Sequence, residues 1–411
     1  MSLRYAASTL ASPWLAVGAL VLLAQSWSSD QFMTGELLLA ADNTALLVML
    51  AGPILAGVSA FDAARHFSPS RVGIFSRAVA RRRESAWLLL WAAGPTAATF
   101  SVATAVRVAV ELSKHGHTAG LPSAVVTVLL QMAALVFFAS LGVLVGRALP
   151  PIIAGVVGLL VGYGVTILGA GQRGVRFGPL DLGGASVSRL GLDLSPSFIA
   201  LQGAILLAVP LTVVLAASVV PPAMDQRMRR ATVGLGILGL LLVAPVPGLP
   251  PSRWVPEPSP PSSCSGENPV VCTYPEHVRQ AQLAEAQIRL YADALQREGI
   301  SALVPQSVQE ISRTYAPGGD AGTRSADLSH YDDTVEARRS LVYDLVTPVH
   351  CPQLVADTAP SDAYFDIVDR LALTFAHVAD PSVEATLWPT EPMTADEAEA
   401  AIDLLWACDF A

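Results

Sequence analysis

The chain has 411 residues and a formal net charge of −9, and 52% of its residues are hydrophobic while only 14% are charged. Soluble domains usually carry about 25% charged residues, so this composition excludes an ordinary soluble protein. Residues 1–246 contain 16 basic and nine acidic side chains, whereas residues 247–411 contain nine basic and 25 acidic ones. The acidic second part argues against a nucleic-acid partner, because binding to phosphates needs clustered Lys and Arg.

Seven apolar stretches in residues 1–246 have about the length that a helix needs to cross the hydrocarbon core of a membrane. A segment in lipid must satisfy its own backbone hydrogen bonds, which predicts helices. The stretches are Leu10–Trp27, Asn43–Phe61, Ala86–Val110, Ser123–Val145, Ile152–Leu168, Phe198–Val220 and Ala231–Val246. Leu37–Ala41 either extends the second stretch or lies at the interface. We therefore expect a mainly α fold in which residues 1–246 form a polytopic bundle of about seven spans.

Basic residues predict the orientation of these spans, because short loops rich in Arg and Lys stay on the cytoplasmic side. Eleven basic residues, including Arg4, fall on one side of the predicted membrane and four fall on the other. The pattern predicts a multi-pass protein of the plasma membrane with a cytoplasmic N-terminus and an extracytoplasmic C-terminal domain. The first span is expected to be a retained anchor, since no cleavage site follows it. Arg outnumbers Lys by 24 to 1, which favours a GC-rich, actinobacteria-like source.

Residues 247–262 form a Pro-rich linker, with the sequence PGLPPSRWVPEPSPP at 247–261. Such a composition is typical of an extended, semi-rigid spacer. Residues 263–411 are then a separate domain that is large enough to bury a core. All four cysteines lie in this domain. Because disulfides persist outside the cytoplasm, the cysteines independently support an extracytoplasmic location.

Four cysteines allow three disulfide pairings, and the sequence alone does not choose among them. We favour Cys264 with Cys272, which would close the SGENPVV loop, and Cys351 with Cys408, which would tie the last helix to the domain. Closing a loop of roughly sixty residues would stabilise the fold by about 4 kcal/mol in the chain-entropy model. The alternative is four buried free thiols.

Hydrophobic periodicity predicts an α-rich domain. Apolar residues recur at helical spacing in Glu276–Gly299. A capping box of Thr394 and Glu397 begins a helix that would run to about Trp406. Further predicted elements are helices at Val335–Leu345 and Tyr364–Val378 and short strands around Val270–Tyr274. The expected domain is small, disulfide-bonded and mainly helical.

No enzymatic motif is present in the sequence. It lacks a phosphate-binding loop, a zinc-binding helix of the H-E-x-x-H type, a G-x-S-x-G nucleophile turn and a dinucleotide fingerprint. We therefore expect no catalytic, cofactor-binding or metal-binding residues in this chain, and no enzyme activity of its own.

Three local pairs are weak candidates for chemistry. His115 and His117 offer two imidazoles in a loop, which are too few ligands for a metal without a third or fourth. The neighbouring pair Glu276 and His277 places His beside a carboxylate, as general acid–base chemistry requires, but we interpret it as solvated acidic surface. We interpret His330-Tyr-Asp332-Asp333 in the same way. His350 precedes Cys351, for which disulfide formation competes with reactivity.

The predicted spans contain few ionisable residues. Charges inside a membrane are costly and mark ion or proton pathways, so their scarcity argues against a proton- or ion-coupled transporter. Arg107 and Glu111 lie four residues apart and can pair on one helix face, which we interpret as a pair at the membrane interface. Gln131 is expected to hydrogen-bond to a neighbouring helix.

The segment Asp62–Glu84 between the second and third spans is the most specific functional feature. It combines arginines with apolar residues at roughly helical spacing, which predicts a short cytoplasmic helix that docks on a soluble partner. Attraction to lipid headgroups is the alternative explanation. The candidate docking residues are Arg65, Arg71, Ile74, Phe75, Arg77, Arg81, Arg82 and Arg83.

This layout resembles the membrane subunit of type-2 ABC exporters, in particular actinobacterial permeases. Those proteins have a cytoplasmic N-terminus, six core spans and a coupling helix between the second and third spans that binds the ATPase. Here the second span ends in AGPILAGVSAFDAARH and runs into Asp62–Glu84. Some of these permeases carry an extracytoplasmic domain with a C-x(7)-C element, which the sequence CSGENPVVC resembles.

The resemblance implies a permease that couples ATP hydrolysis by a separate ATPase subunit to outward transport of a lipid, peptide or antibiotic-like substrate. ATP and Mg would bind to the partner, and the permease would act as a homodimer or a pair in contact with membrane lipid. The alternative is a membrane-anchored sensor or binding protein that transports nothing and whose extracytoplasmic domain binds a ligand or a protein.

Overall fold

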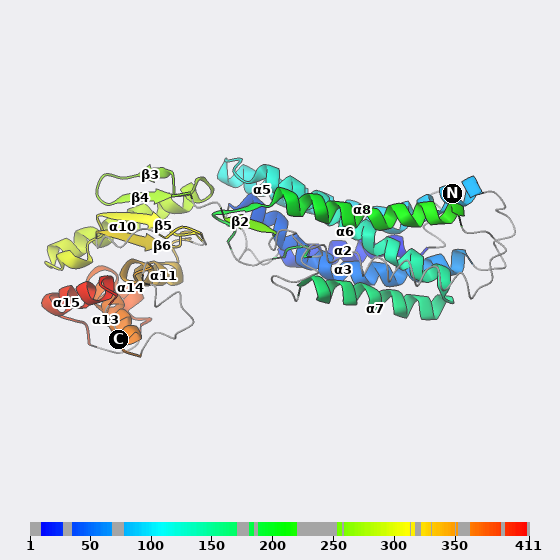
Figure 1. Ribbon diagram of the computed structural model, residues 1–411. Helices are drawn as coiled ribbons and strands as arrows, with labels where there is room; N and C mark the ends of the chain where they lie inside the picture. Colours follow the sequence, from blue (N-terminus) through cyan, green and yellow to red (C-terminus); the bar gives the residue numbers. More distant parts are fainter. Residues whose placement is uncertain are drawn as a thin grey trace.

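The computed structural model describes residues 10–27, 35–67, 78–170, 181–184, 188–219, 253–256, 259–312, 314–316, 322–329, 331–349, 351, 362–387 and 391–408. For the helical residues 25–27, 78–83, 168–170, 214–219 and 362–363 only the backbone is described. The description covers a helical bundle and a C-terminal domain at one end of it (Figure 1).

In the described part of the chain, six helices form the bundle, preceded by a 3₁₀ turn, η1, at Ser12–Trp14. Among the described residues, four helices are long and apolar enough to cross a membrane, and two shorter apolar helices accompany them. The protein is therefore a helical membrane protein. The predicted seventh span, Ala231–Val246, lies outside the described residues. The bundle helices are α2 Leu15–Trp27, α3 Leu37–His66, α5 Ala78–His115, α6 Leu121–Ala148, α7 Pro151–Ala170 and α8 Pro196–Val219.

Helix α3 is longer than the predicted span Asn43–Phe61. The apolar residues Leu37–Ala41 extend it at its start, which settles the choice left open by the sequence. Asp42 consequently lies inside the helix, where its side chain is fully buried. In the sequence, this aspartate marks the boundary of the apolar stretch. The helix continues through Asp42 because its buried side chain has a partner.

Small residues let α3 pack closely against α6. A Cβ atom on Gly142 or Gly146 would overlap the carbonyl oxygens of Ala56 and Ala60 on α3. Such close backbone approach is typical of helix packing in membranes, where lipid supplies no hydrophobic drive for association. Gln131 on α6 also donates to Ala41 O, at 2.7 Å, and accepts from Thr44 Oγ1. The predicted interhelical hydrogen bond of Gln131 is therefore confirmed.

A short antiparallel ribbon lies at the end of the bundle that faces the C-terminal domain (Figure 1). Strand β1, Leu192–Leu194, pairs with β2, Trp254–Pro256, and Asp193 lies opposite Val255. Strand β2 belongs to the segment predicted as a Pro-rich spacer. Part of that linker is thus hydrogen-bonded to the connection before α8.

The C-terminal domain contains a four-stranded sheet in the order β3-β4-β5-β6. Strand β3 runs antiparallel to β4, while β4, β5 and β6 are parallel. The predicted strand around Val270–Tyr274 is β4, whereas β5 and β6 were not predicted. The bounds are β3 Ser263–Ser265, β4 Val270–Thr273, β5 Ser307–Glu310 and β6 Thr323–Ala326.

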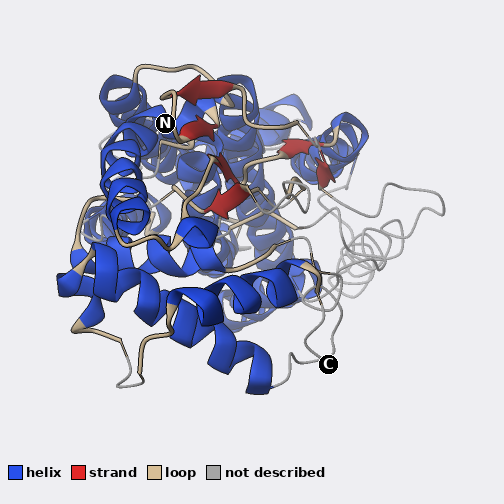
Figure 2. Cartoon of the chain, turned by 90° about the vertical axis from the view of Figure 1, so that its left-hand side faces the viewer, coloured by secondary structure: helices blue, strands red, loops and turns tan. Residues whose placement is uncertain are grey.

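Helices pack against this sheet and form the rest of the domain, as Figure 2 shows from the domain side. The turn η4, Pro275–His277, leads from β4 into helix α10, which connects β4 to β5. The four helices predicted from periodicity are all present, and the capping box of Thr394 and Glu397 is formed. These helices are α10 Val278–Arg297, α11 Val335–Val346, α13 Asp362–Ala379 and α15 Ala395–Trp406, joined by η5 Ser301–Leu303 and α14 Pro381–Glu384.

Both favoured disulfides are confirmed. Cys264 is bonded to Cys272 across the β3–β4 pair, and Cys351 is bonded to Cys408 beyond the end of α15. No cysteine is free. The second bond ties the last helix to the domain core, where Cys351 is fully buried.

The two disulfides should differ in their contribution to stability. They close loops with sequence separations of 57 and 8 residues, so the chain-entropy model assigns about 4 kcal/mol to Cys351–Cys408 and roughly 1.5 kcal/mol less to Cys264–Cys272. We expect Cys351→Ala/Cys408→Ala to lower hydrogen-exchange protection of α13 and α15 more than Cys264→Ala/Cys272→Ala does. Exchange mass spectrometry on the full chain in detergent measures this, and equal loss of protection in both variants would contradict the ranking.

Candidate functional site

Buried and half-buried ionisable side chains gather where the C-terminal domain meets the bundle. We call six of them the junction cluster, and they come from the start of α3, the end of α5, the loop after it, η4 and β5. The cluster consists of Glu36, Glu111, His115, His117, His277 and Glu310. Ionisable side chains are rarely buried unless they are paired. We therefore regard the junction cluster as the candidate functional site.

His277 is the centre of the junction cluster. Its side chain is fully buried, its Nδ1 contacts Glu310 Oε1, and its Nε2 lies 3.5 Å from Glu36 Oε1. Burial opposes a charge on this imidazole, but the charge of Glu310 and the interactions with Glu310 and Glu36 outweigh burial and raise the pKa of His277 to about 10. An imidazolium therefore bridges two carboxylates, one from the domain and one from the start of α3.

Glu310 is held in place by the neighbouring strand. Its Oε2 accepts hydrogen bonds from the hydroxyl of Thr273 and from the backbone N–H of Tyr274, the latter at 2.9 Å. Strand pairing between β4 and β5 positions these groups, because Cys272 lies opposite Gln309. The carboxylate that orients His277 is thus fixed by the sheet and by hydrogen bonds before the domain meets the bundle.

On the bundle side, the residues just before α3 connect three segments. Glu36 Oε2 accepts from the backbone N–H of Arg189 at 2.6 Å, and Gly35 N–H donates to Glu111 Oε2 at 3.0 Å. His115 Nε2 lies 3.6 Å from the same Glu111 oxygen. The start of α3 is consequently bound to the end of α5, to the loop before α8 and, through Glu36, to the C-terminal domain.

His117 lies next to His115, with the two ring centroids 6.3 Å apart. Burial and the positive charge of His277 lower the pKa of His117, against an opposing effect of the Gly35 and Glu276 carbonyl groups. Burial also disfavours the charged form of the neighbouring Glu276 and so raises the pKa of its carboxyl group. The lowered pKa favours the neutral imidazole of His117, which has one ring nitrogen able to accept a hydrogen bond or bind a metal.

A second charged group, here called the arginine clamp, lies close by and consists of Asp42, Arg189, Arg253 and Trp254. Arg189 Nη2 is 2.6 Å from Asp42 Oδ2, and Arg253 Nη2 is 3.6 Å from Asp42 Oδ1. Both guanidinium groups lie over the Trp254 ring, at 4.3 Å for Arg189 and 5.3 Å for Arg253. The clamp binds the start of α3 to the loop before α8 and to β2.

At the far end of the bundle, polar contacts fix the start of η1, the end of α3 and the beginning of α5. Asp62 accepts from the backbone N–H groups of Ala11 and Ser12, at 3.0 and 2.9 Å. His66 Nε2 is 2.7 Å from Glu84 Oε1. The segment Asp62–Glu84 therefore leaves α3 and enters α5 at the end of the bundle away from the C-terminal domain.

The predicted docking residues are only partly described. Arg65 is exposed in the last turn of α3, where its guanidinium lies 5.3 Å from the Phe61 ring centroid. The described backbone places Arg81–Arg83 in the first turns of α5. Arg71, Ile74, Phe75 and Arg77 lie outside the described residues, so the predicted short helix is not tested.

The structure corrects two interpretations of the sequence. His277 is fully buried and bridges two glutamates, whereas we interpreted Glu276 and His277 as solvated surface. Arg107 and Glu111 are buried at 4% and 0% exposure, whereas we placed them at the membrane interface. Both corrections have the same cause, since the docked domain and the neighbouring loops cover this end of the bundle.

The other sequence candidates are not brought together. Asp332 is exposed and accepts from the hydroxyl of Thr334, while Asp333 pairs with Arg338 at 3.3 Å. His330 and His350 lie outside the described residues, and Cys351 is in a disulfide. Among the described residues, no three His, Cys, Asp or Glu side chains already surround one point as a bound metal requires.

Sequence reasoning missed Glu36, Asp42, Arg189 and Arg253 altogether. Each is a single charged residue at the edge of an apolar or Pro-rich stretch, where a charge is ordinary. The only available signal was the position of Glu36 and Asp42 on either side of Leu37–Ala41. Once that stretch is helical, Asp42 lies in the helix and needs a buried partner.

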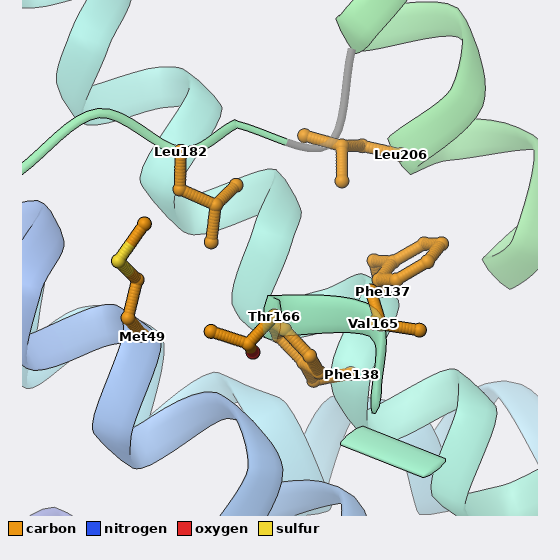
Figure 3. A pocket seen from close by; sticks show the side chains of 7 residues that line it. All are labelled: Met49, Phe137, Phe138, Val165, Thr166, Leu182 and Leu206. Atoms are coloured by element: carbon orange, nitrogen blue, oxygen red, sulfur yellow. The ribbon is translucent and has the colours of Figure 1, made fainter. Parts of the chain in front are cut away.

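A small apolar cavity lies inside the bundle, among α3, α6, α7 and α8 (Figure 3). The lining side chains, which Figure 3 shows pointing toward one another, are Met49, Phe137, Phe138, Val165, Thr166, Leu182 and Leu206. Leu182 precedes Gly183 of the loop that contacts the arginine clamp, so the cavity and the clamp share one loop.

Comparisons with protein-family models, with curated proteins and with solved structures find no match for this chain. Its function is therefore inferred from its own contacts, of which the junction cluster and the arginine clamp are the most developed.

Removing the charge of Glu36 should loosen the contact between domain and bundle. Breaking a buried ion pair from one side costs roughly 3 kcal/mol, because the remaining charge loses its partner. We expect Glu36→Gln to raise hydrogen exchange at 274–280 and at the start of α3 in the full chain. Glu298→Gln, at an exposed site after α10, is the control, and equal exchange in the two variants would disprove the role of Glu36.

The substitution Gly183→Ala tests the geometry of the arginine clamp. Gly183 has a φ of +88°, and a Cβ there would overlap Asp42 Oδ1 and lie 2.7 Å from Arg253 Nη1. Gly299 has a φ of +76° but open space around it. Alanine at either site costs about 1–2 kcal/mol for the left-handed backbone, and only Gly183→Ala adds the overlap. We expect Gly183→Ala to melt at a clearly lower temperature than Gly299→Ala, and equal melting temperatures would contradict the clamp geometry.

Proposed function

We propose that this chain is the membrane permease subunit of an ABC exporter. It couples ATP hydrolysis by a separate ATPase subunit, which binds ATP and Mg, to outward transport of a lipid, peptide or antibiotic-like substrate. The functional unit contains two permease chains in the plasma membrane. In this proposal the N-terminus is cytoplasmic and the C-terminal domain is extracytoplasmic.

One observation supports the proposal best: the same two helices carry contacts at both ends of the bundle. At one end α3 and α5 flank the arginine-containing segment Asp62–Glu84. At the other end they present Glu36 and Glu111 to the junction cluster. A motion imposed on that segment would therefore reach the C-terminal domain through two continuous helices (Figure 1).

Helix α3 is suited to such transmission by its length and packing. It has 30 residues and is therefore about 45 Å long at the usual rise of a helix. Its close packing against the glycines of α6 makes it move with a neighbour rather than bend independently. Arg147 near the end of α6 lies 4.9 Å from the Phe67 ring centroid, so α6 also contacts the region where a partner would bind.

A membrane-anchored sensor or binding protein is the second candidate. It is favoured by the buried bridge of Glu36, His277 and Glu310, which fixes the C-terminal domain directly on the membrane helices. A ligand that shifts the domain would then act on α3 and α5 from the opposite end. The two candidates differ in which end receives the primary signal, and a bound ATPase decides between them.

Charge reversal in the first turns of α5 tests the exporter proposal. We expect Arg81→Glu/Arg82→Glu/Arg83→Glu to reduce recovery of an ATP-binding-cassette subunit at least tenfold. The physical reason is that these arginines would otherwise face an acidic groove on the partner. Photo-crosslinkers placed at 77 and 84 in native membranes, followed by mass spectrometry, identify the partner.

The control variant is Arg289→Glu/Arg297→Glu, which reverses exposed charges on α10 in the C-terminal domain. It should leave recovery of the ATPase unchanged. Undiminished recovery with the triple variant would refute the docking role of these arginines. Crosslinking that reproducibly yields no ATPase with the unaltered chain would instead favour the anchored sensor.

A further inference from the structure

The junction cluster leaves several buried imidazole nitrogens without a hydrogen-bond partner. These atoms are Nδ1 of His115 and both ring nitrogens of His117, which lie near the Gly35 and Glu276 carbonyl groups without a hydrogen bond. Nε2 of His277 and Oε1 of Glu36 likewise make no hydrogen bond and face each other as an ion pair at 3.5 Å. Buried polar atoms without a partner are rare in folded proteins, and a bound water or ion is a standard explanation. Five such atoms on four neighbouring side chains call for a common cause.

We propose that the junction cluster binds one divalent transition-metal ion of the Zn²⁺ class, with His277 and Glu36 as two ligands and the His115–His117 loop as the source of the others. Imidazole nitrogen and carboxylate oxygen are ligands that Zn²⁺ accepts readily, whereas Ca²⁺ and Mg²⁺ prefer oxygen alone. The inference does not rest on the exporter proposal, because metal binding needs no ATPase.

His277 has the environment of a metal ligand. Histidines that bind metals usually direct their other ring nitrogen to a carboxylate, which fixes the tautomer and the ring orientation. Here Nδ1 contacts Glu310, which is itself fixed by Thr273 and Tyr274, and Nε2 is directed toward Glu36. On binding, the metal would replace the proton on Nε2, which is released to solvent.

The spacing of His277 and Glu36 fits one edge of a coordination tetrahedron. With metal–ligand distances of about 2.0–2.1 Å, two ligand atoms of a tetrahedral site lie about 3.4 Å apart. His277 Nε2 and Glu36 Oε1 are 3.5 Å apart. Glu36 is oriented in turn by the hydrogen bond from Arg189 N–H to its other oxygen.

The remaining ligands come from the loop after α5. His115 ends that helix, and its Nδ1 lies 3.1 Å from the point where a Cβ on Gly35 would be, directly before Glu36. His117 follows Gly116, which has a φ of +73° and nothing within 4 Å of a Cβ position. Because no three ligand groups of the described residues already meet at one point, binding requires a rotation of His117 or His115 toward His277.

A metal in this position would join the domain to the bundle. His277 and Glu310 belong to the C-terminal domain, while Glu36, His115 and His117 belong to the start of α3 and the end of α5 with its following loop. The glutamates of the cluster supply negative charge near the ion. The metal would therefore strengthen the same contact that the imidazolium makes without it.

The test uses the full chain, purified in mild detergent without a histidine tag and treated with a chelator, with Zn²⁺ alone as the probe. Isothermal titration should show about one Zn²⁺ per chain, and Co²⁺ in its place should give the visible spectrum of a tetrahedral site. We expect His117→Ala and His277→Gln each to weaken binding at least tenfold. Zn²⁺ should also raise hydrogen-exchange protection at 274–280.

His377→Ala is the matched control, because this histidine lies on the surface of the same domain, where it pairs with Glu384. It should bind Zn²⁺ as the unaltered chain does. The loop variant His117→Ala keeps the test valid should His277→Gln fail to fold, which the melting temperature without metal reveals. Absence of stoichiometric binding, or binding that survives His117→Ala and is lost in His377→Ala, would overturn the proposal.

Discussion

The structure depends on one constraint: a buried charge must have a partner. His277 satisfies it by lying between Glu310 of the domain and Glu36 of the bundle. Desolvating three ionisable groups is costly, and the interaction is favourable only while their geometry is maintained. Consequently, the position of the C-terminal domain on the membrane helices is specified by the few atoms of this bridge as much as by apolar contact.

The same constraint explains the arginine clamp. Asp42 lies inside α3 because Arg189 and Arg253 reach it from two other segments, and burial in turn lowers the pKa of Arg253 against the opposing effect of Asp42. Trp254 covers both guanidinium groups. Segments separated by more than 200 residues are therefore assembled around the start of one helix, and that helix is the structural reference for the whole end of the bundle.

Local signals made much of the fold predictable. The capping box of Thr394 and Glu397, the amphipathic period of α10 and the lengths of the apolar stretches each depend on residues close together in the chain. The short loop between Cys264 and Cys272 favoured the disulfide pairing that the structure shows, although the sequence alone left three pairings open. Strands β5 and β6 were missed because each has four residues of mixed polarity, SVQE and TRSA. Their stability comes from strand pairing, of β5 with β4 and of β6 with β5.

The candidate site was not predictable for a related reason. Glu36 and Glu310 are 274 positions apart in the sequence, and of the three bridge residues only Glu36, beside the apolar stretch Leu37–Ala41, has a neighbour that indicates burial. The predicted helix began at Glu276 and so included His277, whereas His277 lies in the turn η4, directly before α10. Its burial, however, is decided by the bundle that the domain contacts, and contacts of that kind leave no periodic signal.

Coupling through α3 and α5 is necessarily reciprocal. If binding of a partner at the segment Asp62–Glu84 changes the affinity of the C-terminal domain for a ligand by some factor, that ligand changes the affinity for the partner by the same factor. As a mechanical link, the contacts of Glu36 and Glu111 would thus serve an exporter and a sensor alike. The two functions would differ in where free energy enters. In an exporter, an ATPase bound at the segment Asp62–Glu84 would drive the domain, whereas in a sensor a ligand bound to the domain would drive the segment.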